Sequence, residues 1–416
     1  MTVFTPEWRI KIDGDNLTAI TLVGLTINSG RTNINTQPQA SYCQLELINT
    51  NNTDYGFNIN SALTVELKDS TATYVPIFGG KISDVSVGVR AAGSNAYVTS
   101  YQITALGALA KLQKAVWTAA LSQDDDGDQI YTILSDLLLN TWSEVSASQT
   151  WAAYDPTTTW ATAENIGLGE IDQPGQYEME QRSANPIDYY SIVSQIANSA
   201  LGYIYEDANG NIGYADSAHR TTYLAANGYV DLSANDALAL GIRATTRQGA
   251  LVNSFVLNYG NAFNSQKTVL DQDSIDTYGR FQVTQNSLVH DATDAQNIAN
   301  RYVQLRAYPR AQFEKITFAL QNPEITDSDR DALIGVFMGL PIRITDLPAL
   351  ITGGGFEGYV EGWTWRVSIS GLSIDLTLSP TAFSAAAQNW DQVNAAETWN
   401  SILNTLEWQD AIGVIS

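Results

Sequence analysis

The sequence predicts an α+β protein that is mainly β, in which two related small antiparallel β-barrels flank a mixed α/β middle domain and a C-terminal Trp-repeat extension follows. Three observations predict this fold. Strand-like alternation fills the first hundred residues, the same elements return near the C-terminus, and helical spacing is concentrated between them. The expected boundaries are 1–107 for the first barrel, 108–183 for a helical segment with a Trp-repeat insertion, 184–308 for the mixed domain, 309–380 for the second barrel and 381–416 for the extension.

The first barrel is predicted from six runs that alternate apolar and polar residues, with turn signals between them. Successive side chains of a strand point to opposite faces, so each run can bury one face and expose the other. Strands at this spacing are typical of a small antiparallel barrel or sandwich. The runs are WRIKIDG, LTAITLVGLTI, YCQLELI, ALTVELKD, PIFGGKISDVSVGV and AYVTSYQITALG.

Four of these runs have counterparts, in the same order, between residues 311 and 380. QFEKITFALQN matches YCQLELIN, GLPIRITD matches ALTVELKD, GFEGYVEGWTWRV matches IFGGKISDVSV, and LSIDLTLSP matches YVTSYQITALG. In the third pair, Phe78 and Gly80 correspond to Phe356 and Gly358. A repeated order of four elements indicates related modules at the two ends of the chain. We take these four residues as candidate interface positions.

The middle of the chain mixes helices and strands. Apolar residues recur there at the 3.6-residue period of an amphipathic helix, and Asn-Gly marks a tight hairpin turn. An Asn cap followed by Pro predicts one helix start. The expected elements are helices from Thr104, Asp126 and Asn185, a hairpin turning at Asn209-Gly210, a strand from Leu251, a polar loop to Val289 and a helix from Asp291.

Six tryptophans form two series with a period of nine residues. Nine steps of a helix place successive side chains on opposite faces, and an odd spacing does the same on a strand. We therefore expect short units with one aromatic anchor each, suited to docking on a neighbouring subunit. The alternative is that each indole fills the core of its own domain. These candidate interface residues are Trp142, Trp151, Trp160, Trp390, Trp399 and Trp408.

The composition excludes several classes of protein. The 416 residues include 21 basic and 44 acidic side chains, for a formal net charge of −23. Such a surface does not bind nucleic acid through its phosphates, although DNA can pass it without adhering. A single cysteine, Cys43, rules out an internal disulfide. The start has no secretion signal and no apolar run reaches membrane-spanning length, so we expect cytoplasmic assembly and no membrane span.

The order of several short motifs resembles the hub proteins of phage tails, the baseplate hub or minor tail protein family of siphophages and contractile phages. The resemblance covers roughly residues 1 to 380, and the spaced TW segments near the C-terminus are similar too. The motifs are KIDG, FGGKISDV, YQITALGALAKL, IANSALGYIYEDANGNIGYAD, LVNSFVLNYGN, SIDTYG, FEGYVEGWTWRV and LSIDLTLSP.

This resemblance implies a structural virion protein with no enzymatic activity and no cofactor. It implies a homotrimer in which two barrels per chain form a pseudo-sixfold ring at the distal end of the tail tube. The implied partners are the tail tube or distal tail protein, the tape measure protein, and tip or fibre proteins. Genome DNA is expected to pass through the ring without specific binding.

The main rival function is a tail-tip protein that binds or cleaves glycans. Glu178 and Glu180 are spaced to share one strand face at about 7 Å, within the range of an inverting glycosidase. A solvated strand face explains the same pair. A cell-surface adhesin is a third alternative, which the missing secretion signal argues against.

Other chemistry finds less support in the sequence. His219 and His290 lie in separate segments and no G-x-S-x-G elbow is present, which argues against nucleophilic catalysis. The acidic run around Asp126 fails the calcium-loop pattern, because Ile133 stands where a bidentate Glu is required. An acidic helix N-terminus explains that run, and an irregular cation site is the alternative. TGGGFEG enters a strand rather than a helix and so lacks a phosphate-binding helix terminus.

Overall fold

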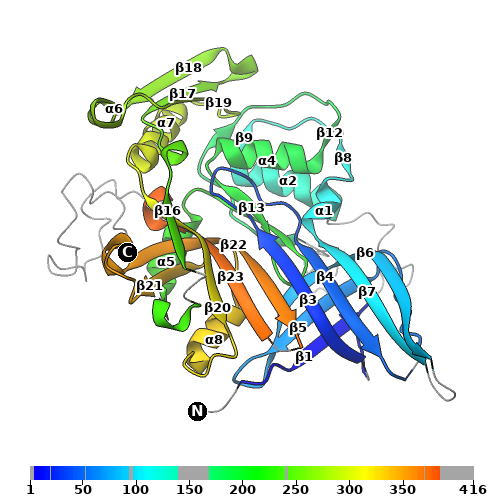
Figure 1. The fold of residues 1–416 in the computed structure, drawn as a ribbon. Coiled ribbons are helices and arrows are strands. Elements are labelled where there is room, and N and C mark those ends of the chain that lie inside the picture. Colours follow the sequence, from blue (N-terminus) through cyan, green and yellow to red (C-terminus); the bar gives the residue numbers. More distant parts are fainter. Residues whose placement is uncertain are drawn as a thin grey trace.

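The computed structural model of the protein describes residues 4–138 and 168–384, apart from residues 19, 52, 93–96, 239–241 and 370. A large sheet forms the lower part of the molecule in Figure 1, and a layer of helices and small sheets lies above it. The fold is therefore mainly β with a mixed α/β part, as the sequence predicts. In the described part of the chain, no helix combines the length and apolarity needed to cross a membrane.

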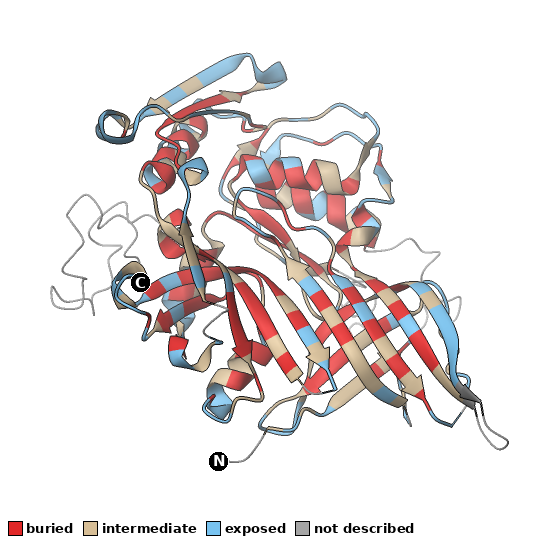
Figure 2. Cartoon of the chain, viewed as in Figure 1, coloured by how far each residue is buried: buried red, intermediate tan, exposed pale blue. Residues whose placement is uncertain are grey.

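The N-terminal β unit contains six main strands that pair in the spatial order β3-β4-β7-β6-β5-β1, all antiparallel. Burial alternates along them, as Figure 2 shows for β3 and β4. On β4, for example, Cys43, Leu45 and Leu47 are buried while Tyr42 and Gln44 are exposed. The strands are β1 (Trp8–Ile12), the short β2 (Asp15–Asn16), β3 (Ile20–Gly30), β4 (Tyr42–Asn49), β5 (Ala62–Lys68), β6 (Tyr74–Ala92) and β7 (Tyr97–Gly107).

The C-terminal β unit repeats this arrangement with six strands in the order β16-β20-β23-β22-β21-β15. Taken in chain order, each of its strands occupies the same place as its counterpart in the first unit. One pairing differs, because β15 lies parallel to β21 whereas β1 lies antiparallel to β5. The strands are β15 (Val230–Ser233), β16 (Arg243–Thr246), β20 (Ala311–Ala319), β21 (Pro341–Thr345), β22 (Phe356–Ser368) and β23 (Gly371–Pro380). Strands β15 and β16 come from the range that the sequence assigned to the middle domain.

The prediction of two β-barrels is corrected, because no ladder closes either unit in the described residues. Closing the first unit would require β3 to meet β1, but the free side of β3 pairs with β22 of the second unit. In the second unit, the described residues between β15 and β16 meet β20 in an isolated bridge between Ala237 and Phe318 rather than in a ladder. The two units instead join into one 13-stranded sheet.

The pairing of β3 with β22 forms the seam between the units, and two glycines allow it. Gly30 faces Gly362 across the seam. A Cβ on Gly362 would lie 2.6 Å from the Arg31 carbonyl oxygen, and one on Gly30 would lie 2.3 Å from that of Glu361. Gly30 also has a φ of +81°, a conformation that favours glycine. The backbones can therefore approach here only because both residues lack a side chain.

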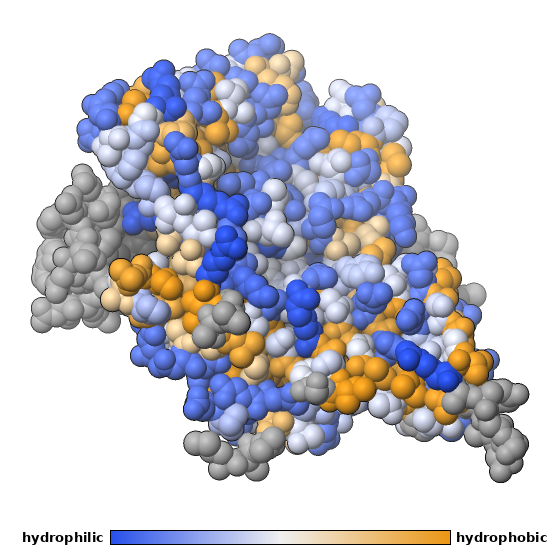
Figure 3. Space-filling view, viewed as in Figure 1, coloured by the Kyte–Doolittle hydropathy of each residue, from blue (hydrophilic) through white to orange (hydrophobic). Residues whose placement is uncertain are grey.

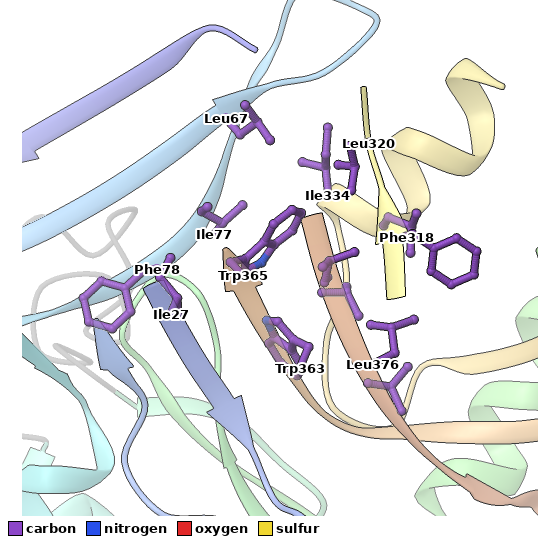
Figure 4. Packing of buried hydrophobic residues seen from close by; sticks show 14 of the residues in the cluster. Ile27, Leu67, Ile77, Phe78, Phe318, Leu320, Ile334, Trp363, Trp365 and Leu376 are labelled. Carbon is purple, nitrogen blue, oxygen red and sulfur yellow. The ribbon is translucent and has the colours of Figure 1, made fainter. Parts of the chain in front are cut away.

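A single hydrophobic core runs across the seam. It contains side chains from both units. Figure 4 shows the Trp365 ring between Ile77 of the N-terminal unit and the side chains of Leu320 and Ile334 on the other side. Trp365 is 0% exposed and is among the largest fully buried side chains. The two units therefore share one packed interior.

The middle part has its own core, built mainly by three helices that pack against small sheets. In α2, Ile130, Ile133, Leu134 and Leu138 are buried at helical spacing, and Leu137 is partly buried. The helices are α1 (Leu109–Leu112), α2 (Asp126–Leu138), α4 (Tyr189–Ser199), α5 (His219–Asn227), α6 (Gln272–Tyr278), α7 (Ala292–Arg306) and, within the C-terminal unit, α8 (Asp327–Ile334). The remaining strands are β8 (Val116–Trp117), β9 (Asp124–Asp125), β10 (Leu168–Ile171), β11 (Glu178–Met179), β12 (Ile187–Asp188), β13 (Tyr203–Glu206), β14 (Ile212–Ala215), β17 (Ser254–Tyr259), β18 (Ser265–Leu270) and β19 (Gln282–Asn286).

Three local predictions differ from this structure. The helix expected from Thr104 begins only at Leu109, as the short α1, because the residues as far as Gly107 belong to β7 and pair with neighbouring strands. The helix expected from Asn185 begins at Tyr189, where Asp188 accepts a hydrogen bond from the Ser191 amide and caps it. The expected polar loop before Val289 contains β18, α6 and β19, which pair with or follow β17.

Candidate functional site

A cavity of about 630 Å³ lies where the seam between the two β units meets the middle part. Its lining comes mainly from five segments: the loop after β3, the end of α4 with the residues that follow it into β13, the residues before and at the start of α5, the end of β19 with Leu288, and the C-terminal end of α7. Phe263, Phe383 and Ser384 complete the lining. Every main part of the described fold therefore contributes to this one cavity.

The carboxylate of Glu361, on β22, is buried beside the cavity and holds two of the arginines that line it. Arg31 Nε lies 2.6 Å from Glu361 Oε2, and Arg220 places Nη1 and Nη2 at 2.7 and 2.9 Å from the two carboxylate oxygens. The Ser379 hydroxyl also donates to Glu361. Burial alone would raise the pKa of Glu361, but the charges of Arg220 and Arg31 outweigh it and lower the pKa to about 2. Glu361 is therefore ionised at neutral pH and ties the loop after β3 to α5.

Two further arginines line the cavity and bond only to neutral acceptors in the described residues. Arg301 Nη2 donates to the carbonyl oxygens of Ser217 and Ser384, at 2.9 and 3.2 Å. Arg306 Nη1 donates to the Phe383 carbonyl oxygen at 2.7 Å, while its Nε has no partner there. Arg306 is only 6% exposed, and burial lowers its pKa to about 10, so it remains charged at neutral pH. The cavity therefore carries positive charge inside a strongly acidic protein.

Asp126, from the acidic run, is buried and organises the loop opposite the N-terminus of α2. Its Oδ1 accepts hydrogen bonds from the amides of Gln176 and Tyr177, both at 2.8 Å, and its Oδ2 accepts one from the Tyr214 hydroxyl. In the described residues, no three His, Cys, Asp or Glu side chains are grouped so that they could hold a metal ion. Asp126 therefore fixes this loop to the start of α2.

Asp126 should make stability depend on pH between about 4 and 6. Burial raises its pKa from 3.8 to about 6, despite the three hydrogen bonds. A raised carboxyl pKa contributes stability that is fully present below the unfolded value and is lost as the pH rises through the folded value. The shift corresponds to about 3 kcal/mol at 1.36 kcal/mol per pKa unit. In Asp126→Asn, the free energy of unfolding, measured by urea titration from pH 4 to 7, should lack this decline.

The exposed neighbour Asp124 provides the control for this experiment. Asp124→Asn should keep the pH profile of the wild type, because Asp124 lies on the surface. An Asp126→Asn profile parallel to the wild type would contradict the role assigned to the buried carboxyl.

The four candidate interface residues on β6 and β22 occupy equivalent places in the two units. Gly80 pairs with Leu63 and Gly107, and Gly358 pairs with Ile342 and Pro380. A Cβ added to either glycine would lie 2.3 Å from a backbone carbonyl oxygen of the neighbouring strand, β7 for Gly80 and β23 for Gly358. It would also lie within 2.7 Å of the phenylalanine ring two residues earlier in the chain. The rings of Phe78 and Phe356 are buried, at 2% and 6% exposure. The two phenylalanine side chains pack in the protein's own core. The role of all four residues at an interface stays a prediction.

The six tryptophans of the two repeats all lie outside the described residues, so their predicted docking role stays a prediction. Glu178 and Glu180 do not line the cavity. Glu178 Oε1 accepts a hydrogen bond from Gln123 at 2.8 Å, and Glu180 Oε1 lies 2.9 Å from His290 Nδ1. The other histidine, His219, has a different partner: its Nδ1 lies 2.8 Å from Asp172 Oδ2. Each of these groups thus has a partner of its own.

The arginine cavity was not predicted from the sequence. Arg31 and Glu361 are separated by 330 residues, and no local spacing connects them. One signal was available, since Glu361 stands in the apolar strand FEGYVEGWTWRV. A carboxylate at a buried strand position is almost always paired, so a cationic partner could have been expected there.

Comparison with known proteins gives a likeness of fold. No protein-family model and no curated protein matches the sequence. Among solved structures, a tail protein from Neisseria meningitidis MC58 is similar with a TM-score of 0.58 and 11% identity, covering 92% of this chain and 98% of that one. The 43 kDa tail protein of prophage MuSo2 from Shewanella oneidensis gives 0.56 and 10%, covering 91% and 98%.

A third similar structure is prophage tail protein gp18 from Listeria monocytogenes EGD-e, with a TM-score of 0.50 and 10% identity, covering 89% of this chain and 94% of that one. In each case the likeness extends over nearly the whole of both chains. The resemblance to phage tail proteins that the sequence motifs carry is thus confirmed at the level of the fold.

Proposed function

We propose that this protein is a structural component of a phage tail, the hub at the distal end of the tail tube, where three chains form a ring with pseudo-sixfold symmetry. The observation that carries this proposal is the repeated strand order of the two β units within one sheet. The fold likeness to prophage tail proteins supports it.

The repeat matters because of symmetry. A threefold ring of chains with one module each offers three equivalent docking faces, whereas two equivalent modules per chain offer six. A hexameric tube on one side and a threefold tip on the other can then both be matched. The shared core across the seam fixes the two modules relative to each other, as such an adaptor requires.

Equivalent hairpins of the two units expose apolar side chains that suit contacts within the ring. On the β6–β7 hairpin, Val87 and Val89 are 59% and 65% exposed, and on the β22–β23 hairpin Ile369 is 81% exposed. Figure 3 shows apolar residues along the lower right edge, where Figure 1 places β6 and β7. We propose that these hairpins contact neighbouring chains or the tube, together with the tryptophan segments.

The charge of the chain fits a passage for DNA. Three chains would carry 3 × (−23) = −69 formal charges. An acidic opening repels phosphates, so a genome can pass without adhering. The remaining proposed partners are the distal tail protein, the tape measure protein and tip or fibre proteins, in a virion tail assembled in the host cytoplasm.

Native mass spectrometry of the purified full chain tests the ring. We expect a species of about 136 kDa, three times the 45.2 kDa chain. In Val89→Asp, a charge at the hairpin should shift the population toward single chains, because burying an unpaired carboxylate is costly. Leu270→Asp is the matched control: Leu270 is 45% exposed on β18, outside both β units, and its variant should stay trimeric. A wild-type chain that remains monomeric at its highest soluble concentration would overturn the proposal.

A further inference from the structure

We propose that the central cavity is a binding site for a small oxyanion, a molecule bearing phosphate or carboxylate groups, held by Arg301 and Arg306. This inference concerns a single chain and is independent of the ring. It rests on the charge of the lining, on the buried Arg306 guanidinium without a counter-ion, and on the size of the cavity.

The charge of the lining is opposite to that of the protein. Arg31, Arg220, Arg301 and Arg306 line the cavity, and Asp216 is the one carboxylate in the lining. Glu361 neutralises part of the charge of Arg31 and Arg220. Asp216 is occupied with the amides of Ala218 and His219, both at 2.8 Å, and with Gln176 Nε2 at 2.9 Å. The charges of Arg301 and Arg306 therefore have no carboxylate of their own in the described residues.

Arg306 is the residue whose environment points most directly to a ligand. Its side chain is almost fully buried, and a buried charge is costly unless it is paired. Its partners are uncharged: it donates to carbonyl oxygens and lies over the rings of Phe383 and Tyr302, at 4.3 and 5.8 Å from their centroids. These contacts compensate only part of that cost, because none of them carries a negative charge. The Arg306 Nε is unsatisfied in the described residues. An anion in the cavity would provide the missing counter-charge.

The size and the polar lining fit a small molecule. Pockets for small ligands generally span about 300–1,000 Å³, and this cavity measures about 630 Å³. Amide and hydroxyl side chains surround the arginines, including Gln195, Asn198 and Ser217. Guanidinium groups bind carboxylates and phosphates through paired, charge-assisted hydrogen bonds. The arrangement therefore recognises an oxyanion and offers neutral donors to the rest of the molecule.

Thermal unfolding of the full chain tests this proposal. Inorganic phosphate and citrate are titrated against sodium chloride at matched ionic strength and constant pH. Because a ligand that binds only the folded state raises its stability, we expect the Tm to rise and saturate with phosphate or citrate but not with chloride. The anion that saturates at the lower concentration identifies which chemistry the site prefers. Isothermal titration of that anion should give one site per chain.

Variants separate binding from a purely structural role of the arginines. Arg301 is only half-buried, so the Arg301→Gln variant should still fold. We expect this variant to lose the saturable rise in Tm. Arg343→Gln is the control, because Arg343 pairs on the surface with Asp231 and should leave the rise unchanged. A merely structural arginine would lower the Tm equally in all anions. The proposal fails if phosphate and citrate act no differently from chloride, or if Arg301→Gln keeps the saturable rise.

Discussion

Replacing Glu361 with glutamine is expected to lower the free energy of unfolding by about 3–5 kcal/mol at pH 7, the usual cost of removing one partner from a buried ion pair. Glu361 is 1% exposed, and the substitution leaves Arg31 and Arg220 buried without their counter-ion. Urea denaturation at pH 7 measures the loss.

Asp231→Asn is the matched control for Glu361→Gln. Asp231 also accepts two hydrogen bonds from an arginine, Arg343, at 2.6 and 2.9 Å, but both side chains are about half exposed. Exposed pairs contribute roughly 0–1 kcal/mol, so this variant should be nearly as stable as the wild type. Equal losses in the two variants would contradict the role of the buried cluster.

The pH dependence gives Glu361→Gln a second readout. The pKa of Glu361 is lowered from 4.5 to about 2, so its contribution is present above the unfolded value and is lost as the pH falls through the folded one. The wild type should therefore lose about 3 kcal/mol from this group between pH 4.5 and 2, at 1.36 kcal/mol per pKa unit. The variant should lack that part of the acid-induced loss.

Truncating Trp365 to alanine is expected to cost about 3–5 kcal/mol, the usual range for a large aromatic residue removed from a core. The indole contacts both units, so its loss should destabilise both of them together. Chemical denaturation followed by circular dichroism should show one cooperative transition at lower denaturant concentration. Trp365→Phe, which fills part of the space, should cost less.

Leu350→Ala provides the surface control for Trp365→Ala. Leu350 is fully exposed, so its truncation should change stability by no more than about 0.5 kcal/mol. A Trp365→Ala variant with two separate transitions, one of them at the wild-type position, would show that the units do not share a core.

Much of the fold could be predicted because burial leaves a local pattern. The period of two along β4 and the apolar stripe of α2 are visible in the sequence, and both elements form as expected. The helix expected from Thr104 forms only from Leu109, because pairing of β7 with two neighbouring strands outweighs the helical spacing before that point. The first barrel failed because closure depends on which strand meets the free side of β3, and that contact joins residues more than 300 positions apart.

Less of the candidate site than of the fold could be predicted from the sequence. Phe78 and Phe356 were recognised as counterparts, but an alternating pattern does not distinguish a face that meets a partner from one that meets the protein's own core. The four arginines of the cavity are scattered over the chain, at positions 31, 220, 301 and 306. Only folding brings these arginines together, so no local motif in the sequence predicts the cavity.

We propose that one chain carries two equivalent β units so that three chains imitate sixfold geometry. Electron-microscopy class averages of the purified full chain, viewed along the particle axis, distinguish this arrangement from the alternatives. We expect six similar β densities around an axial opening, alternating in their outer features so that the true symmetry is threefold. A compact particle without an opening, or a ring whose six densities come from six chains, would contradict it.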